Sequence, residues 1–193
     1  MRTSLIALFG VVLAVAPCDG QDRPSVLIVY YSVTGHTRTM AEAVAEGARS
    51  VEEVDVILLS VDQATTDDVL SAGAIIIGSP VHNANVAPAI QTFMNRWPFE
   101  DAPLAGKIGA AFVTAGGISA GEELVQLSIL HSMLIFGMIV VGGPDWTQPF
   151  GASAVTFERP FNSPDSLEIA PAFRQKGFAL GRRVAELTKN LHQ

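Results

Sequence analysis

The chain has 193 residues, of which 49% are hydrophobic and only 16% are charged, and its formal net charge is −7. This composition excludes a disordered chain and is typical of a single globular domain. Because only 12 residues are Lys or Arg, we expect no binding surface for the phosphate backbone of a nucleic acid.

The first residues differ from the rest in composition. Arg2 precedes an apolar run at residues 5–16, and Pro17 and Gly20 follow it, a pattern typical of a signal peptide and too short to span a bilayer comfortably. We therefore expect residues 1–20 to be an export signal with an uncertain boundary, which would place the protein in the periplasm or outside the cell. An uncleaved membrane anchor is the alternative.

The remaining residues, 21–193, are expected to form one domain. The only cysteine, Cys18, lies before this domain. No disulfide, thiol nucleophile or cysteine-ligated metal is therefore expected within the domain, and the residue pattern suggests no other metal site.

Short runs rich in Val and Ile recur along the domain without alternating between apolar and polar residues. Such runs indicate strands that are covered on both faces, as in a parallel sheet. They lie at residues 26–31, 74–78, 108–113 and 138–141, and a half-alternating run at residues 54–59 predicts an edge strand.

Apolar residues at helical spacing lie between these runs. The stripes are Met40, Val44, Gly47, Ala48 and Val51; Val86, Ile90, Phe93, Met94 and Trp97; Leu124, Leu127, His131 and Leu134; and Phe173, Leu180, Val184, Leu187 and Leu191. His131 is expected to be structural, a weaker helix is expected within residues 62–72, and residues 163–165 resemble the start of the last helix, with a break or kink at Pro171. The alternation of strand and helix predicts an α/β, doubly wound, five-stranded parallel sheet in a three-layer sandwich. We take its strand order to be 2-1-3-4-5, one of the two common orders of such sheets.

The turn after the first strand suits a phosphate group. It contains three hydroxyls, a glycine and a histidine, namely Ser32, Thr34, Gly35, His36 and Thr37. A helix begins there, and its N-terminus presents N–H groups and the positive end of its dipole to an anion. The turn has neither the lysine of a nucleoside triphosphate loop nor the three glycines of a dinucleotide loop. A well-capped helix without a ligand is the alternative, and His36 is expected to be a loop residue.

Two further loops follow the third and fourth predicted strands and, in this sheet order, flank the first. Small residues in such loops leave room for a flat ring and present backbone N–H groups to its edge. The candidate residues are Pro80, Val81, His82, Asn83 and Asn85 in one loop and Thr114, Ala115, Gly116 and Gly117 in the other. The irregular stretch 142–163 is long enough to be functional, and its Trp146 and Phe150 are expected either to close over the ring or to pack between subunits.

With these motifs, the chain from about residue 26 to residue 191 resembles the flavodoxin superfamily, and within it the tryptophan-repressor-binding-protein type of NAD(P)H:quinone oxidoreductase. The segments that carry the resemblance are VLIVYYSVTGHTRTMAEAVAEGA, AIIIGSPVHNANVAPAIQTF, GMIVVG and PFGA. The resemblance implies that FMN binds with its phosphate at residues 32–37 and its ring between residues 81–85 and 114–117. It also implies a homo-oligomer, with Thr34 near an incoming nicotinamide nucleotide and Trp97 or Phe99 near the substrate.

The chain departs from the family pattern at two places. His82 and Asn83 stand where the family has an arginine followed by an aromatic that faces the flavin, and Phe136 stands where the family has a histidine. Both departures remove groups that would contact flavin or substrate. From the resemblance as a whole we expect an FMN-dependent oxidoreductase that passes electrons from NAD(P)H to a quinone or a similar small acceptor. The alternatives are a flavodoxin-type electron carrier and a binding domain of this fold that has lost FMN.

Overall fold

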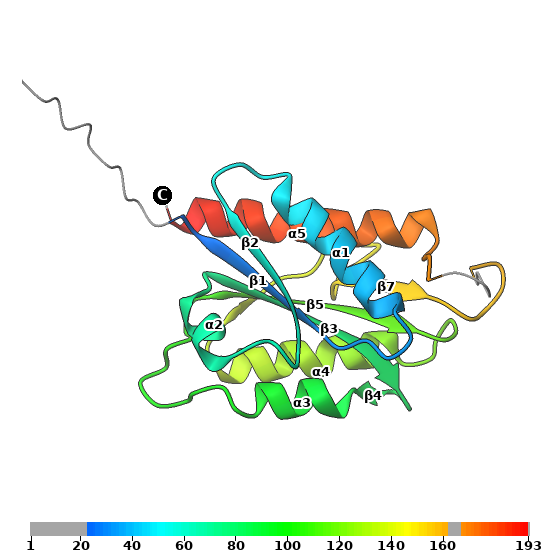
Figure 1. Cartoon of the computed structure of the whole chain (residues 1–193), viewed down its shortest axis with the longest axis horizontal. Helices are drawn as coiled ribbons and strands as arrows, with labels where there is room; N and C mark the ends of the chain where they lie inside the picture. The colour runs from blue at the N-terminus through cyan, green and yellow to red at the C-terminus, as the bar shows by residue number, and fades with distance from the viewer. Residues whose placement is uncertain (1–22, 162–166, 193) are drawn as a thin grey trace, which may run out of the picture.

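A computed structural model describes residues 23–161 and 167–192 (Figure 1). The expected export signal at residues 1–20 lies outside these ranges and stays a prediction. Within the two described ranges, no helix is both long and apolar enough to cross a membrane.

The described residues form one twisted sheet with helices on both sides (Figure 1). The strands are β1 (Ser25–Tyr30), β2 (Asp55–Ser60), β3 (Ala74–His82), β4 (Asn85–Val86), β5 (Ile108–Ala115), β6 (Ile139–Val140) and β7 (Ala152–Val155). The helices are α1 (His36–Arg49), α2 (Thr66–Ser71), α3 (Pro88–Met94), α4 (Glu122–Ile135) and α5 (Pro171–Leu191). The parallel order β2-β1-β3-β5-β6 confirms the predicted topology, including the edge position of the second strand.

The fifth position of the sheet differs from the prediction. The expected strand at residues 138–141 is reduced to β6, and β7 pairs with the other half of β5. Between the two, the chain leaves the sheet at Gly142, where an added Cβ meets the Pro149 carbonyl oxygen at 2.0 Å. Because β7 is rich in alanine, it lacks the Val and Ile run by which the other strands were recognised. The irregular stretch 142–163 therefore contains a strand.

Two apolar layers hold the helices against the sheet. Alternate side chains of β1 divide between them, because Leu27 and Val29 point to the face covered by α2, α3 and α4, whereas Val26 and Ile28 point to α1 and α5. Every residue of β5 is buried. The sheet is thus covered on both sides, as the unbroken apolar runs predicted.

Helix α4 presents a different face to the core from the one predicted. Its buried side chains include Val125, Ile129 and Met133, whereas Leu124 is 62% exposed and Leu134 is 51% exposed. His131 is also exposed, so its expected structural role is wrong. Apolar residues occur nearly all round this helix, and its periodicity alone does not identify the buried stripe.

The other helix predictions are confirmed or refined. The weaker helix becomes α2, and the side chain and amide of Thr65 hold the pKa of Asp68 below its usual range in a capping box. Pro171 is the first residue of α5 and neither breaks nor kinks it, since proline suits a first helical turn. The expected cap at residues 163–165 lies outside the described ranges.

Helices α1 and α5 pack with their backbones in close approach. An added Cβ at Gly47 meets the Phe178 carbonyl oxygen at 1.9 Å, and one at Gly181 meets the Val44 carbonyl oxygen at 1.9 Å. At Gly177 the nearest atom is the flexible thioether sulfur of Met40, at 3.0 Å.

We expect Gly47→Ala to lower the free energy of unfolding by about 2 kcal/mol or more, because backbone atoms must move apart. Gly177→Ala is the matched control and should cost less, since Met40 can adopt another rotamer and alanine favours a helix by up to about 1 kcal/mol. Urea unfolding followed by circular dichroism measures both. Equal stability of the two variants would contradict the close approach.

Candidate active site

The structure brings the three predicted loops together at the carboxyl ends of β1, β3 and β5. The hydroxyls of Thr37 and Thr114 share a buried hydrogen bond of 2.7 Å, which joins the first loop to the end of β5. The rings of Tyr31 and His82 lie edge to face with centroids 6.2 Å apart. A Cβ added at Gly121 meets the Cβ of Ala84 at 2.7 Å, so the second and third loops are also in contact.

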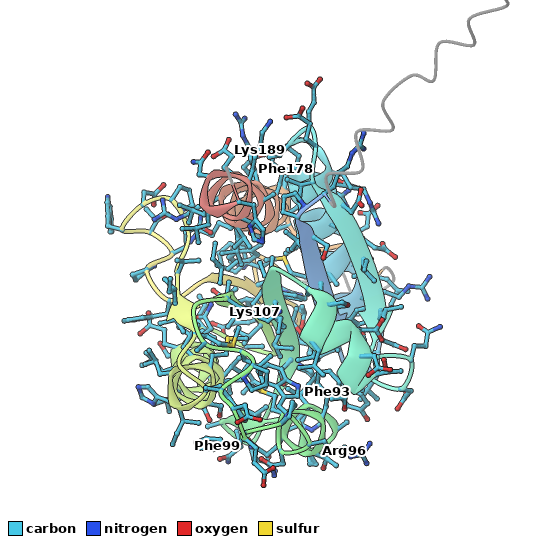
Figure 2. All side chains as sticks on the ribbon, turned by 90° about the vertical axis from the view of Figure 1, so that its left-hand side faces the viewer. Phe93, Arg96, Phe99, Lys107, Phe178 and Lys189 are labelled. Atoms are coloured by element: carbon cyan, nitrogen blue, oxygen red, sulfur yellow. The ribbon has the colours of Figure 1, made fainter. Side chains whose placement is uncertain are left out.

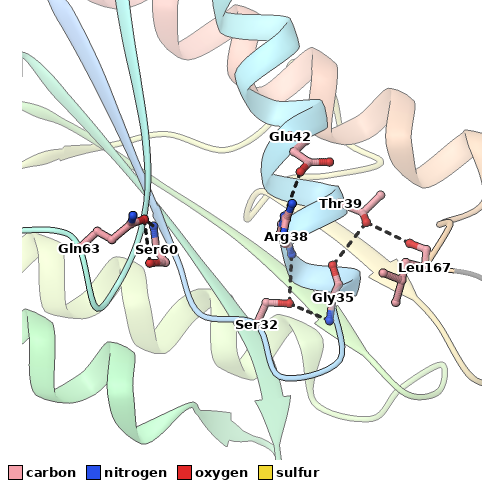
Figure 3. Close-up of polar contacts among 8 residues, drawn as sticks. All are labelled: Ser32, Gly35, Arg38, Thr39, Glu42, Ser60, Gln63 and Leu167. Atoms are coloured by element: carbon pink, nitrogen blue, oxygen red, sulfur yellow. Dashed lines mark hydrogen bonds and ion pairs between the residues drawn. The ribbon is translucent and has the colours of Figure 1, made fainter.

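The first loop is held open by its own hydroxyl groups (Figure 3). Ser32 Oγ accepts from the amides of Gly35 and Arg38 at 3.1 and 3.3 Å. Gly35 stands at the N-cap of α1 with a φ of 99° and has no side chain to occupy the space before the helix. Thr39 Oγ1 donates to the Leu167 carbonyl at 3.0 Å and fixes the far side of this turn. The result is a preformed helix N-terminus of the kind that binds anions.

His36 is placed differently from the prediction. It is the first residue of α1, not a loop residue, and its side chain is buried. Its Nδ1 is joined to Thr34 Oγ1 by a hydrogen bond of 3.0 Å. Its ring meets Phe157 edge to face at a centroid distance of 5.3 Å. The imidazole is therefore fixed in orientation at the helix start, where a phosphate is expected.

The second loop is a tight hairpin between β3 and β4. Asn83 and Ala84 have φ angles of 50° and 60°, as a two-residue type I′ turn requires. Asn85 Nδ2 donates to the Asn83 carbonyl at 2.7 Å, and Ser79 Oγ accepts from the Ala87 amide at 3.0 Å. These bonds keep the loop fixed, with Asn83 itself exposed.

The Gly-rich third loop has two amides that already pair with carboxylates. Glu158 Oε2 accepts from the Ile118 amide at 2.7 Å, and Glu122 Oε1 accepts from the Ser119 amide at 3.0 Å. A Cβ added at Gly117 would lie 2.7 Å from that Glu158 oxygen. The loop is therefore built to present N–H donors to an acceptor, and Glu158 fills one of these positions.

Phe157 and Glu158 are site residues that the sequence reasoning did not single out. They follow β7, whose ladder continues as the Phe157 amide donates to the Gly116 carbonyl at 3.0 Å. The only signal for them was their place in the long irregular stretch. Of the two aromatics named there, Phe150 packs against the α3 and α4 layer, and Trp146 is 87% exposed.

Of the proposed substrate residues, Thr34 lies at this site, but Trp97 and Phe99 do not join it within one chain. Trp97 and Phe99 pack against Phe136, with ring centroids 5.5 and 5.6 Å from it. Phe136 precedes Gly137, whose carbonyl accepts from the Gly106 amide just before β5 begins. This cluster therefore lies at the opposite edge of the sheet, where the parallel strands begin. The length of β5, about 23 Å, separates it from the candidate site. Figure 2 looks onto that edge, where Phe99 and Lys107 are labelled.

The charges at that opposite edge serve to cap helices. Lys107 Nζ donates to the carbonyls of Leu70 and Ala72 at the end of α2, and burial lowers its pKa. Across the described ranges, no group of three or more His, Cys, Asp or Glu side chains could hold a metal ion.

The site at the carboxyl edge fits FMN. Its first loop offers a helix N-terminus, hydroxyls and a histidine of fixed orientation for the phosphate. The other two loops present small residues, and the Ile118 amide of the third loop pairs with Glu158. Thr34 is exposed beside His36, where an incoming second molecule can reach it. Pro80, Val81, Ala115 and Gly116 lie on the strand ends and turns that frame the same space.

The Thr37 and Thr114 pair gives a test of how the loops are coupled. Because each hydroxyl is buried, Thr37→Val or Thr114→Val should lower the free energy of unfolding by about 1–3 kcal/mol. The double variant should cost clearly less than the sum, since neither hydroxyl is then left unpaired. Urea unfolding of the four proteins measures the coupling, and strict additivity would show that the bond does not form.

Comparison with known proteins identifies relatives of this chain. The family model described as NADPH-dependent FMN reductase matches residues 60–152. A flavodoxin of Aquifex aeolicus (strain VF5) is 38% identical over 83% of this chain and 85% of its own length. An NAD(P)H dehydrogenase (quinone) of Syntrophobacter fumaroxidans is 30% identical over 86% of this chain and 98% of its own length.

Solved structures show the same fold. The flavodoxin-like, WrbA-like protein from Agrobacterium tumefaciens superposes with a TM-score of 0.71 at 21% identity, over 88% of this chain and 99% of that one. The chain belongs to the flavodoxin superfamily, among its FMN-dependent oxidoreductases.

Proposed function

We propose that this oxidoreductase takes electrons from NAD(P)H and passes them to a quinone or a similar small flat acceptor. The observation that carries the proposal is the match to a relative named NAD(P)H dehydrogenase (quinone) over 98% of that relative's length. The open, small-residue rim formed by Asn83, Ala84 and Gly121 supports it, because a second flat molecule can approach there.

Each loop has a distinct task in this proposal. Ser32, Gly35 and Thr37 shape the helix N-terminus that holds the FMN phosphate, and the hydrogen bond to Thr34 fixes the orientation of the His36 ring beside it. Val81 to Asn85 line one side of the ring, and Thr114 to Gly117 present backbone groups to its edge. His82 takes the place of the family arginine as the nearest cationic side chain when protonated.

The protein's contribution to the chemistry is binding and orientation. FMN, when bound, supplies hydride and electron transfer. The chain positions the donor and the acceptor in turn at the exposed side of the site, next to Thr34 and Asn83. No side chain is required as a nucleophile, and none is proposed as a catalytic residue.

A flavodoxin-type electron carrier is the second candidate function. The Aquifex aeolicus flavodoxin, 38% identical to this chain, favours it. A carrier receives its electrons from a protein partner and need not react with NAD(P)H, so one titration distinguishes the two functions.

We expect FMN to bind to the purified chain and its visible absorbance band to bleach when NADH or NADPH is added without oxygen. Re-oxidation by a soluble quinone then completes the reaction. Absorbance spectroscopy in an anaerobic cuvette measures both steps.

If FMN binds but only a chemical reductant bleaches it, the carrier function replaces our proposal. If FMN does not bind, both redox functions fail and the chain is a binding domain of this fold that has lost its cofactor. Bleaching by nucleotide with no re-oxidation by any quinone would instead overturn the acceptor class.

Glu158 provides a second test, because its carboxylate occupies the Ile118 amide. We expect Glu158→Gln to bind FMN about three- to tenfold more tightly, since the neutral glutamine oxygen accepts from the Ile118 amide more weakly than the carboxylate does, by roughly 1 kcal/mol. Quenching of flavin fluorescence measures the affinity. Glu123→Gln is the matched control, because Glu123 lies exposed in the first turn of α4 and changes the net charge equally. Weaker binding by Glu158→Gln would show that the carboxylate helps to hold the cofactor.

A further inference from the structure

Phe157 is a large apolar side chain that stays exposed beside the candidate active site. Its side chain is 62% exposed, although it follows the end of β7 directly and Thr156 before it is buried. A single exposed apolar residue is common on protein surfaces and needs no explanation by itself. The contacts of its ring therefore decide whether its position has a function.

The Phe157 ring contacts two of the three loops that form the site. Its edge-to-face contact with His36, at a centroid distance of 5.3 Å, places it at the N-terminus of α1, where the phosphate is expected. A Cβ added at Gly116 would lie 3.4 Å from Cδ2 of the same ring, so the ring also borders the third loop, where the flavin edge is expected. Phe157 thus lies between the places expected for the two ends of FMN, which the ribityl chain joins.

The backbone on both sides of Phe157 is tied to the third loop. The amide and the hydroxyl of Thr156 both donate to the Ala115 carbonyl, at 2.9 and 3.1 Å. On the other side, Glu158 Oε2 accepts from the Ile118 amide at 2.7 Å. The phenyl group is therefore presented from a fixed backbone, and a ligand that covers it has little chain to order.

Phe157 and Asn83 border the third loop from opposite sides. Strand β7 pairs with β5 on the side away from β3, whereas Asn83 lies at the tip of the hairpin that extends β3. Asn83 stands where the family has an aromatic and offers no ring to the cofactor. Phe157 offers an exposed aromatic surface from the β7 side instead.

We propose that Phe157 is a binding residue for FMN and that its ring packs against the ribityl chain and the adjoining part of the flavin. The cofactor then covers the exposed phenyl surface, and the apolar area removed from water contributes to the affinity. This inference rests on the binding of FMN, which the proposed function also requires, but not on the electron donor or the acceptor.

Three ligands distinguish direct contact from an effect that passes through His36. We expect Phe157→Ala to bind both FMN and riboflavin about tenfold more weakly, because both ligands cover the phenyl surface that the substitution removes. Inorganic phosphate contains neither the ribityl chain nor the ring, so its competition with FMN should be unchanged. Phe157→Leu keeps most of the apolar surface and should stay within about threefold of the wild-type affinity.

Leu191→Ala is the control, because it removes a similarly exposed apolar side chain at the end of α5, far from the three loops. It should leave the affinity for both flavins unchanged. Titrations of the oxidised flavins, followed by their fluorescence without nucleotide or quinone, measure the affinities, and circular dichroism verifies that each variant is folded.

Equal affinities of the wild type and Phe157→Ala for both flavins would overturn the inference. A loss of affinity for FMN and phosphate, with riboflavin unaffected, would show that Phe157 acts only by positioning His36 and would overturn the direct contact. A wild type that binds neither flavin would overturn this inference and the proposed function together. Tenfold weaker flavin binding by Phe157→Ala would support the inference even if the bound FMN does not react with NAD(P)H, which would contradict only the proposed function.

Discussion

The whole structure depends on covering a parallel sheet on both faces. Each of the eight residues of β5 is buried, so helices must pack above and below it. Here each crossover helix packs on one face and returns the chain to the same end of the sheet, so the strands of the β2-β1-β3-β5-β6 order are parallel. Their carboxyl ends then share one edge. The convergence of the three loops is thus a consequence of burial, and the hydrogen bond between Thr37 and Thr114 fastens two of them at that edge.

The sequence was sufficient to predict those elements whose burial requires a repeated pattern of apolar residues. The unbroken Val and Ile runs predicted four strands, and the common order of doubly wound sheets then predicted the end of the sheet at which the loops meet. It was insufficient where tertiary contacts decide between equivalent local patterns. Helix α4 has apolar residues on several sides, so only packing on the sheet selects Val125 and Ile129 over Leu124 and Leu127. The alanines of β7 have no strand signature of their own and pair because β5 presents an open edge.

The candidate site shows the same division. Ser32 to Thr37 were predictable because a strand, a glycine and hydroxyls in sequence describe a helix N-terminus directly. Glu158 was not predictable. Its contact with Ile118 joins residues that are forty positions apart, and only the pairing of β5 with β7 brings them together. The family resemblance alone implied that Trp97 or Phe99 lies near the substrate. A resemblance does not specify at which end of the sheet α3 stops. Helix α3 carries them to the edge opposite the loops.

The two departures from the family pattern differ in consequence because they lie at opposite edges. Phe136 packs with Trp97 near the start of β5, so its exchange for the family histidine leaves the loops of the same chain untouched. Asn83, by contrast, is exposed at the tip of the loop that frames the expected flavin site. An aromatic at that position covers the ring, whereas an asparagine held in a left-handed turn leaves that side accessible. Access to the ring matters more to an enzyme that binds two substrates in turn than to a carrier that exchanges electrons through a protein contact. The departure at Asn83 therefore changes access to the expected ring, whereas the departure at Phe136 leaves it unchanged within the same chain.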